Sequence, residues 1–376
     1  METFNPFIMK VYLGEDYFCN RNKEREEIIQ NAINFRSTTL FSPRRMGKTG
    51  LIFHIFEKYS KENEAICLYT DILSAQNLRD LTEILANKIF NKLDIKKGLV
   101  TKLREAIKSL RPVLRYNSIT GEPEVSFDFN TTQQYEHTLQ ELLFLLDKQG
   151  VPVIVTIDEF QQVSQFPEKN TEALLRSIMQ QLKNTQFIFS GSNQKMMHQI
   201  FNHAKRPFFA SCANLHLKEI DRSEYAQFVS KHFENRKRNI SHEAIAYIMD
   251  FSFMHTYYAQ YFCHYVFAKG IKKIDEQAVR LCAYEILKQN ESIYYQYRNL
   301  LTHTQWEVLR AIGKEEKVYQ IQSTHFINKH KLGTPSSVKR SVDALMEKEM
   351  IYRTNYEEKP YYIVYDKFLL RWMQYI

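Results

Sequence analysis

Apolar positions in the first half of the chain follow two spacings that alternate. Residues 24–33 and 47–59 have apolar side chains at helical spacing, whereas residues 37–42 and 65–71 are short β-branched and apolar runs. Alternating helices and strands are typical of β-α-β units, in which helices cover a parallel sheet. The pattern therefore predicts an α/β domain at the start of the chain.

Two further strands are predicted downstream in the same domain. Residues 151–157 are almost entirely apolar, as expected for a central parallel strand whose two faces are both buried. Residues 186–190 form the next such run, after a helical segment over residues 171–182. A turn cluster followed by alternating residues predicts a hairpin inserted at about residues 112–130.

The second half of the chain has helical spacing throughout residues 221–290. Residues 301–376 predict three helices closed by a hairpin, with Thr334 capping the third helix and Pro335 at its first position. Three helices and a hairpin make a winged helix. The predicted domains are thus a core with the parallel sheet over residues 1–218, a helical lid over 219–295 and a winged helix over 296–376.

Composition narrows the class of protein. The 376 residues are 44% hydrophobic and 25% charged, which is ordinary globular usage. A net charge of +8 permits contact with phosphates without requiring it. The five cysteines include no C-x-x-C pair, so neither a disulfide framework nor a zinc site is indicated. With no leader and no long apolar run, we expect a cytoplasmic protein with no membrane partner.

The clearest candidate chemistry lies between the first predicted strand and the helix that follows it. The residues there are Ser42, Pro43, Arg44, Arg45, Met46, Gly47, Lys48, Thr49 and Gly50. They match the phosphate-binding pattern G-x-x-x-x-G-K-[ST] except at the first position, where Ser42 replaces glycine. Gly47 lets backbone N–H groups face a phosphate, Lys48 reaches the β- and γ-oxygens, and Thr49 supplies a hydroxyl ligand for Mg²⁺. The loop predicts ATP or ADP with Mg²⁺; the alternative is a helix start with an exposed lysine.

A second motif comes about 110 residues later, where the apolar strand ends in Asp158 and Glu159. An apolar strand that ends in two acids is the usual partner of such a loop in phosphoryl transfer. Asp158 is expected to hold Mg²⁺ through water, and Glu159 is the candidate general base for attack on the γ-phosphate. The alternative is an acidic first turn of a helix, which becomes less attractive once the loop at Lys48 is considered.

The next strand ends in Ser190-Gly191-Ser192-Asn193. Ligands of open α/β sheets bind outside the carboxyl ends of the strands, so Ser192 and Asn193 are candidates for orienting water against the γ-phosphate. A turn followed by a helix cap is the equal alternative.

Together these residues resemble a known family, the AAA-type P-loop ATPases of the STAND group, and among them the archaeal-type ATPases with a C-terminal winged helix. The most specific carriers are the strings Arg-Arg-Met-Gly-Lys-Thr (44–49) and Asp-Glu-Phe-Gln (158–161). Less specific motifs of the resemblance are Asn5-Pro6-Phe7, Tyr17–Arg21, Ser190-Gly191-Ser192 and the closing Tyr365-Asp366-Lys367-Phe368 with Trp372.

The resemblance implies a P-loop sheet of AAA-like type followed by a helical lid and a winged helix. It also implies that the segment from Tyr17 to Glu24 lies against the adenine or ribose, which makes Arg21 a nucleotide-binding candidate. Two departures from the family pattern are Ser42 and the lid segment 253–260, which lacks the family's glycine and proline and offers no arginine. Hydrolysis is therefore expected to be slow or to depend on a partner.

The remaining candidate residues are arginines that could contact the γ-phosphate and residues of the winged helix that could contact DNA. Arg44, Arg45, Arg176 and Arg206 are each available to a γ-phosphate, but none stands out as an arginine finger. In a DNA reader the third helix of the winged helix enters the major groove, where it would present Ser337, Lys339 and Arg340, with Arg353 on the hairpin. Because acidic residues share that helix, contact with DNA and contact with protein remain equal alternatives.

The sequence thus predicts an ATP-hydrolysing switch whose nucleotide state controls the DNA or protein contacts of the winged helix, or nucleotide-dependent self-association. A winged-helix DNA-binding regulator with a structural, non-hydrolysed nucleotide is the first alternative. A P-loop small-molecule kinase is the second, and the acidic pair combined with a winged helix argues against it.

Overall fold

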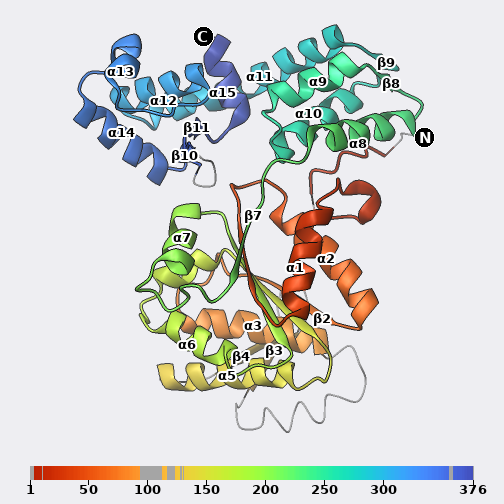
Figure 1. Cartoon of the computed structure of the whole chain (residues 1–376), viewed down its shortest axis with the longest axis vertical. Helices are drawn as coiled ribbons and strands as arrows, with labels where there is room; N and C mark the ends of the chain where they lie inside the picture. The colour runs from red at the N-terminus through yellow and green to blue at the C-terminus, as the bar shows by residue number, and fades with distance from the viewer. Residues whose placement is uncertain are drawn as a thin grey trace. The chain divides into compact units, whose positions relative to one another are not determined.

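The computed structural model describes residues 4–10, 12–93, 112–116, 123–127, 129, 131–354 and 359–375. The chain forms two compact units (Figure 1). Residues 21–218 make one of them, called here the sheet unit. The described residues up to Asn20 join those from Glu219 onward in the other, the helical unit. Each unit has its own hydrophobic core.

A five-stranded parallel sheet organises the sheet unit, with strand order β2-β5-β6-β1-β7. The strands are β1 (Thr38–Phe41), β2 (Ile66–Asp71), β5 (Val153–Asp158), β6 (Thr185–Gly191) and β7 (Ala213–His216). Four of them were predicted, and β5 is buried along its whole length, as a strand between two neighbours should be. The edge strand β7 was missed, because four residues with alternating burial carry little pattern.

Helices cover the sheet as the apolar spacing predicts. They are α1 (Asn22–Ile33), α2 (Lys48–Asn63), α3 (Leu78–Leu93), α5 (Thr132–Asp147), α6 (Thr171–Met179) and α7 (Gln194–Asn202), with 3-10 turns at Glu15–Tyr17 in the helical unit and Phe160–Gln165. Helices α3 and α5 lie side by side (Figure 1) and bury leucines at helical spacing. Strands β3 (Pro112–Tyr116) and β4 (Pro123–Phe127) pair antiparallel as the predicted hairpin, whose turn over 117–122 lies outside the described residues.

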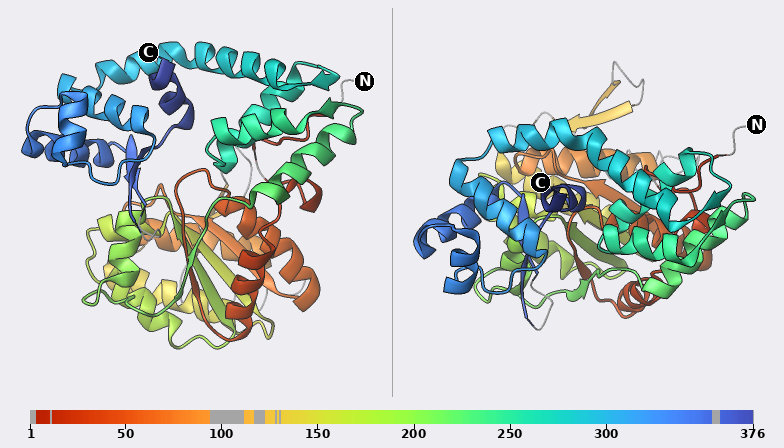
Figure 2. Two further views of the ribbon diagram at one scale, coloured as in Figure 1. Left: turned by 45° about the horizontal axis from the view of Figure 1, so that its top comes forward. Right: turned by 90° about the horizontal axis from the view of Figure 1, so that it is seen from above.

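The helical unit contains α8 (Arg222–Glu234), α9 (His242–Phe251), α10 (Thr256–Ala268) and α11 (Glu276–Asn299). The expectation of helices throughout this region was wrong at two places, where β8 (Asn239–Ile240) and β9 (Lys273–Ile274) pair in parallel. Two residues are too few for a strand pattern to stand out. Figure 2 shows α11 as one long helix, and it packs against α9 and α10 and also against the last helix of the chain.

The winged helix is confirmed, with one correction. Its elements are α12 (His303–Glu315), α13 (Thr324–His330), α14 (Pro335–Glu347), β10 (Ile351–Arg353), β11 (Tyr362–Val364) and α15 (Lys367–Tyr375). Thr334 caps α14 and Pro335 opens it, as predicted. The hairpin does not close the chain, because α15 follows it. Asp366 starts that helix by accepting hydrogen bonds from the N–H groups of Phe368 and Leu369.

The first described residues pack within the helical unit. Phe7 is fully buried there, with its ring centroid 5.1 Å from that of Phe233. Asn5 Nδ2 donates to the carbonyl of His264, which fixes the backbone beside Phe7. The lid and the winged helix share one hydrophobic core, so the division into three domains remains a prediction. No helix in the described ranges has the length and apolar character needed to cross a membrane.

Candidate nucleotide-binding site

The loop between β1 and α2 has the backbone that a phosphate-binding turn needs. Gly47 has a φ of 94°, in the left-handed region where a side chain would be strained, and it is the residue from which α2 starts. Ser42, Pro43 and Met46 are buried, whereas Arg44 and Thr49 are exposed. The N-terminal turn of α2, with its N–H groups and positive dipole end, is therefore held on a buried base.

Lys48 is buried at the start of α2, with 7% of its surface exposed. Its Nζ lies 3.2 Å from Ser42 Oγ and 3.2 Å from the carbonyl oxygen of Pro43. Burial lowers the pKa of Lys48, and the carboxylates of Asp158 and Glu159 partly oppose that shift. The serine that replaces the usual glycine thus supplies an additional polar partner to this lysine.

Asp158 ends β5, at the carboxyl edge of the sheet, and is 5% exposed. Its Oδ1 accepts from Ser190 Oγ at 2.6 Å and from the backbone N–H of Glu159 at 3.0 Å. Its Oδ2 accepts from the hydroxyl of Tyr69 at 2.6 Å. Tyr69 and Ser190 come from the two strands that flank β5, so the sheet itself positions the carboxylate.

Glu159 follows directly, in a left-handed backbone conformation with a φ of 57°. Its Oε2 accepts from Ser192 Oγ at 2.8 Å, from the Ser192 N–H at 3.3 Å and from Gln161 Nε2 at 2.5 Å. Glu159 stands at the start of the 3-10 turn Phe160–Gln165, but its side chain makes no cap hydrogen bond there. Its carboxylate is held against the end of β6.

The two candidates after β6 have different surroundings. Ser192 is 5% exposed and contacts Glu159. Asn193 caps α7 by accepting from the N–H of Met196 at 3.1 Å, so its side chain has the structural role that was the alternative. A role for Ser192 in orienting water stays a prediction.

Several side chains of this site were not predicted. Tyr69, Ser190 and Gln161 all contact the acidic pair. The available signal was that Tyr69 and Ser190 lie near the carboxyl ends of the strands that flank β5, and that Gln161 lies in the turn directly after β5. Gly191 also matters, because a Cβ there would lie 2.1 Å from Gln161 Oε1. Glycine is what lets Gln161 approach β6 closely enough to hold Glu159.

Arg21 begins the sheet unit and lies next to the loop. It is 4% exposed, donates from Nη1 to Glu24 at 2.9 Å and reaches the carbonyl of Met46 at 3.5 Å. Its backbone has a φ of 68°, just before α1. Tyr17 is the first residue of the segment that was expected to lie against the adenine or ribose. It belongs to the helical unit.

The other candidate arginines differ in their partners and their exposure. Arg206 pairs with Glu172 of α6, which gives it a structural partner. Arg44 and Arg45 are exposed on the loop, and Arg45 has a φ of 63°. Arg176 is half-buried on α6.

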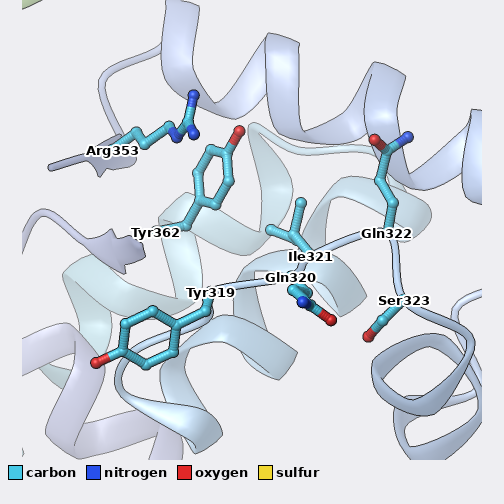
Figure 3. A pocket seen from close by; sticks show the side chains of 7 residues that line it. All are labelled: Tyr319, Gln320, Ile321, Gln322, Ser323, Arg353 and Tyr362. Carbon is cyan, nitrogen blue, oxygen red and sulfur yellow. The ribbon is translucent and has the colours of Figure 1, made fainter. Parts of the chain in front are cut away.

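The candidate DNA contacts lie on the winged helix. Lys339 and Arg340 are exposed on α14, Ser337 is half-buried, and Arg353 is exposed at the end of β10. Arg353 lies beside the ring of Tyr362, 5.8 Å from its centroid, at a pocket of about 300 Å³ (Figure 3). Figure 3 shows the segment from Tyr319 to Ser323 along the other side of that pocket. Gln322 Nε2 reaches the carbonyl of Pro335 at 3.4 Å, so the pocket adjoins the start of α14.

Oxygen ligands suited to Mg²⁺ are present after β1 and at the end of β5. Thr49 offers a hydroxyl and Asp158 a carboxylate, which are the hard donors this cation prefers. In the described part of the chain, no three His, Cys, Asp or Glu side chains gather as a dedicated metal cage. That is compatible with Mg²⁺, which is usually held by one or two protein oxygens together with substrate phosphates.

The loop, the parallel sheet and the acidic strand edge define a protein of the P-loop nucleotide-binding class. Residues 18–252 match a family model described as an ATPase domain predominantly from Archaea, and residues 292–375 match a probable winged helix domain. The first match spans more than half of the chain, and the protein belongs to this ATPase family. No curated protein matches the sequence.

Solved structures give the same fold. A Walker-type ATPase of Pyrococcus abyssi has a TM-score of 0.67 at 14% identity, over 98% of this chain and 99% of its own. The ORC2 protein of Aeropyrum pernix, solved as ADPNP–ADP complexes, has a TM-score of 0.55 at 12% identity, over 100% and 98%. The ORC1 protein of the same organism, in complex with DNA, has a TM-score of 0.50 at 12% identity, over 96% and 93%. Such identities support a shared fold alone.

Proposed function

We propose that the protein is a slow, Mg²⁺-dependent ATPase that acts as a switch, in which the nucleotide bound to the sheet unit controls the contacts of the winged helix. The observation that carries this proposal is the placement of Lys48, Asp158 and Glu159 after the carboxyl ends of β1 and β5 in one parallel sheet, with each side chain held by hydrogen bonds. A cation and two carboxylates held at one sheet edge suit a triphosphate, its metal and an attacking water.

Each side chain has a distinct task in this proposal. Lys48 neutralises the β- and γ-phosphates, and the N–H groups after Gly47 bind the phosphate oxygens. Thr49 and Asp158 hold Mg²⁺, which supplies charge neutralisation when bound. Glu159 orients and deprotonates water, and Ser192 fixes the direction of its carboxylate through the 2.8 Å hydrogen bond.

Coupling to the winged helix is proposed from the chain's organisation. The two units are joined by two stretches of backbone, at Asn20–Arg21 and at Lys218–Glu219. Arg21 also contacts the loop through Met46, so one of those connections is attached to the nucleotide site. A change in the loop on hydrolysis therefore has a covalent route toward the helical unit.

The decisive experiment compares ATP hydrolysis and ATP binding in wild-type protein and Glu159→Gln, with Mg²⁺ and with or without duplex DNA. We expect the variant to bind ATP as tightly as the wild type and to lose turnover by about 100-fold or more, because general-base catalysis contributes about 10²–10⁴-fold. The matched control is Glu168→Gln, at a carboxylate of the sheet unit that accepts from the N–H of Leu78. Unchanged turnover in Glu159→Gln would show that this residue is not the base.

A second candidate function is a DNA-binding regulator whose nucleotide is structural. The exposed Lys339, Arg340 and Arg353 favour it. Neutralising Lys339 and Arg340 together should weaken binding to duplex DNA and reduce its salt dependence, because fewer counterions are released. The control is Lys288→Gln, an exposed lysine on α11. Binding that falls equally in both proteins would indicate nonspecific attraction to the basic chain.

A further inference from the structure

We propose that Tyr69 is a positioning residue for Asp158, and that its hydroxyl strengthens the magnesium dependence of nucleotide binding. This inference rests on the proposed function, because Thr49 and Asp158 are the side chains expected to hold the metal. Tyr69 itself does not ligate the metal in this scheme. It holds the carboxylate of Asp158 in place for the metal.

Tyr69 is fixed between the loop helix and the acidic strand. It lies on β2, where its backbone is in register with Thr156, two residues before Asp158 on β5. Its hydroxyl donates to Asp158 Oδ2 at 2.6 Å. Its ring packs against Phe53 of α2, with the centroids 5.0 Å apart. The hydroxyl is therefore held by its ring as well as by its hydrogen bond.

The direction of this hydrogen bond follows from the number of protons available. A carboxylate only accepts, so Tyr69 must give its single proton to Asp158. The donated proton fixes the direction in which Oδ2 presents its remaining lone pair.

Two further donors hold the carboxylate of Asp158. Of about four lone-pair positions on a carboxylate, three are occupied by donors from Ser190, the Glu159 backbone and Tyr69. The remaining position is on Oδ2, beside the tyrosine hydroxyl. Hydrogen bonds of this kind orient a metal's ligands, and removing one usually costs about 10- to 100-fold in metal affinity.

The test is Tyr69→Phe, which keeps the ring packing and removes only the hydroxyl. Binding of a fluorescent ADP is measured with excess chelator and across a titration of Mg²⁺. We expect unchanged affinity without metal, and a midpoint of the Mg²⁺ titration that rises by about 10- to 100-fold. Tyr59→Phe is the matched control, because Tyr59 is a buried tyrosine on α2. It should leave both quantities unchanged.

A double-mutant cycle separates this role from a general loosening of the sheet edge. If Tyr69 acts through Asp158, the effects of Tyr69→Phe and Asp158→Asn on the Mg²⁺ midpoint should be clearly less than additive. Additive effects, an unchanged midpoint or a lower midpoint in Tyr69→Phe would each overturn the role. Wild-type protein that binds no nucleotide at all would overturn the proposed function and this role with it. Metal-strengthened binding that survives Tyr69→Phe would overturn the role alone.

Discussion

Each of the two units buries a lysine, and the surroundings of these two lysines differ. Lys48 in the sheet unit is 7% exposed, and Lys367 in the helical unit is 2% exposed. Burial is the main cause that lowers the pKa of both. Lys48 faces the carboxylates of Asp158 and Glu159 across the strand edge. Both of those carboxylates are themselves held in place by hydrogen bonds.

Lys367 is held by neutral groups instead. Its Nζ donates to the carbonyl of Val364 at 2.8 Å and to the Tyr352 hydroxyl at 3.4 Å, and it lines a pocket of about 460 Å³. Burial lowers its pKa to about 7, although Glu219 and Asp366 act in the opposite direction and Lys317 adds to the lowering. The comparison teaches that a buried lysine near prearranged carboxylates suits a phosphate that binds together with a cation, as the proposed function requires. One held by a carbonyl and a phenol titrates near neutrality.

The largest expected effect is on Lys48, the lysine assigned to phosphate. Lys48→Ala should weaken ATP binding by about 3–6 kcal/mol, at least 100-fold, because two charge-assisted contacts to phosphate oxygens are lost. Isothermal calorimetry with ATP and Mg²⁺ measures this directly. Lys61→Ala, on the same helix, is the control, since Lys61 is 71% exposed and pairs with Glu57 at the surface. Retained affinity in Lys48→Ala would remove the contrast between the two lysines.

The second prediction concerns the pH dependence that Lys367 contributes. Because its pKa falls from 10.5 to about 7 on folding, the unfolded chain binds more protons between these values, and stability rises with pH there. From pH 7 to pH 9 the contribution is about 2–3 kcal/mol. Lys367→Met should lack it, so the free energy of unfolding of the wild type relative to this variant should increase over that interval.

Tryptophan fluorescence is the suitable measurement for Lys367. Trp306 and Trp372 are the two tryptophans of the chain, and both are buried in the helical unit, so urea unfolding followed by fluorescence reports on that unit. The same titration of Lys48→Ala should change this signal little. If the free energies of unfolding of the wild type and Lys367→Met differ by the same amount at pH 7 and at pH 9, the pKa of Lys367 is not lowered on folding.

The sequence predicts those features that depend on residues close together in the chain, and it misses those that depend on residues far apart in the chain. Gly47, Lys48 and Thr49 were predictable because loop chemistry requires fixed residues at fixed spacing. Tyr69 was not, because its role comes from the register between β2 and β5, which are 87 positions apart at Ile66 and Val153. The helix α15 was missed because a hairpin ordinarily closes a winged helix, and its apolar face is explained only by packing on α11 and α12.

The smallest expected effects are on stability, and they come from replacing a capping residue of one helix in each unit. Asn193 caps α7 and Thr334 caps α14, each by accepting from the N–H group three residues later. Replacing either by alanine should cost about 1 kcal/mol of stability, because one N–H at the helix start loses its partner. Thr334→Ala should lower the urea midpoint seen by tryptophan fluorescence. Asn193→Ala should leave that midpoint unchanged and should instead speed hydrogen exchange in the first turn of α7.

The same pair of variants also decides between the two expectations for Asn193. If its side chain is only a cap, Asn193→Ala hydrolyses ATP at the wild-type rate once the protein is folded, as Thr334→Ala should. If turnover falls while hydrogen exchange in α7 is unaltered, the amide acts on the reacting water and the capping assignment is insufficient. Because Ser192 already holds Glu159 by a 2.8 Å hydrogen bond, unchanged turnover is the expected result. The carboxylate would then keep its orientation without the neighbouring amide.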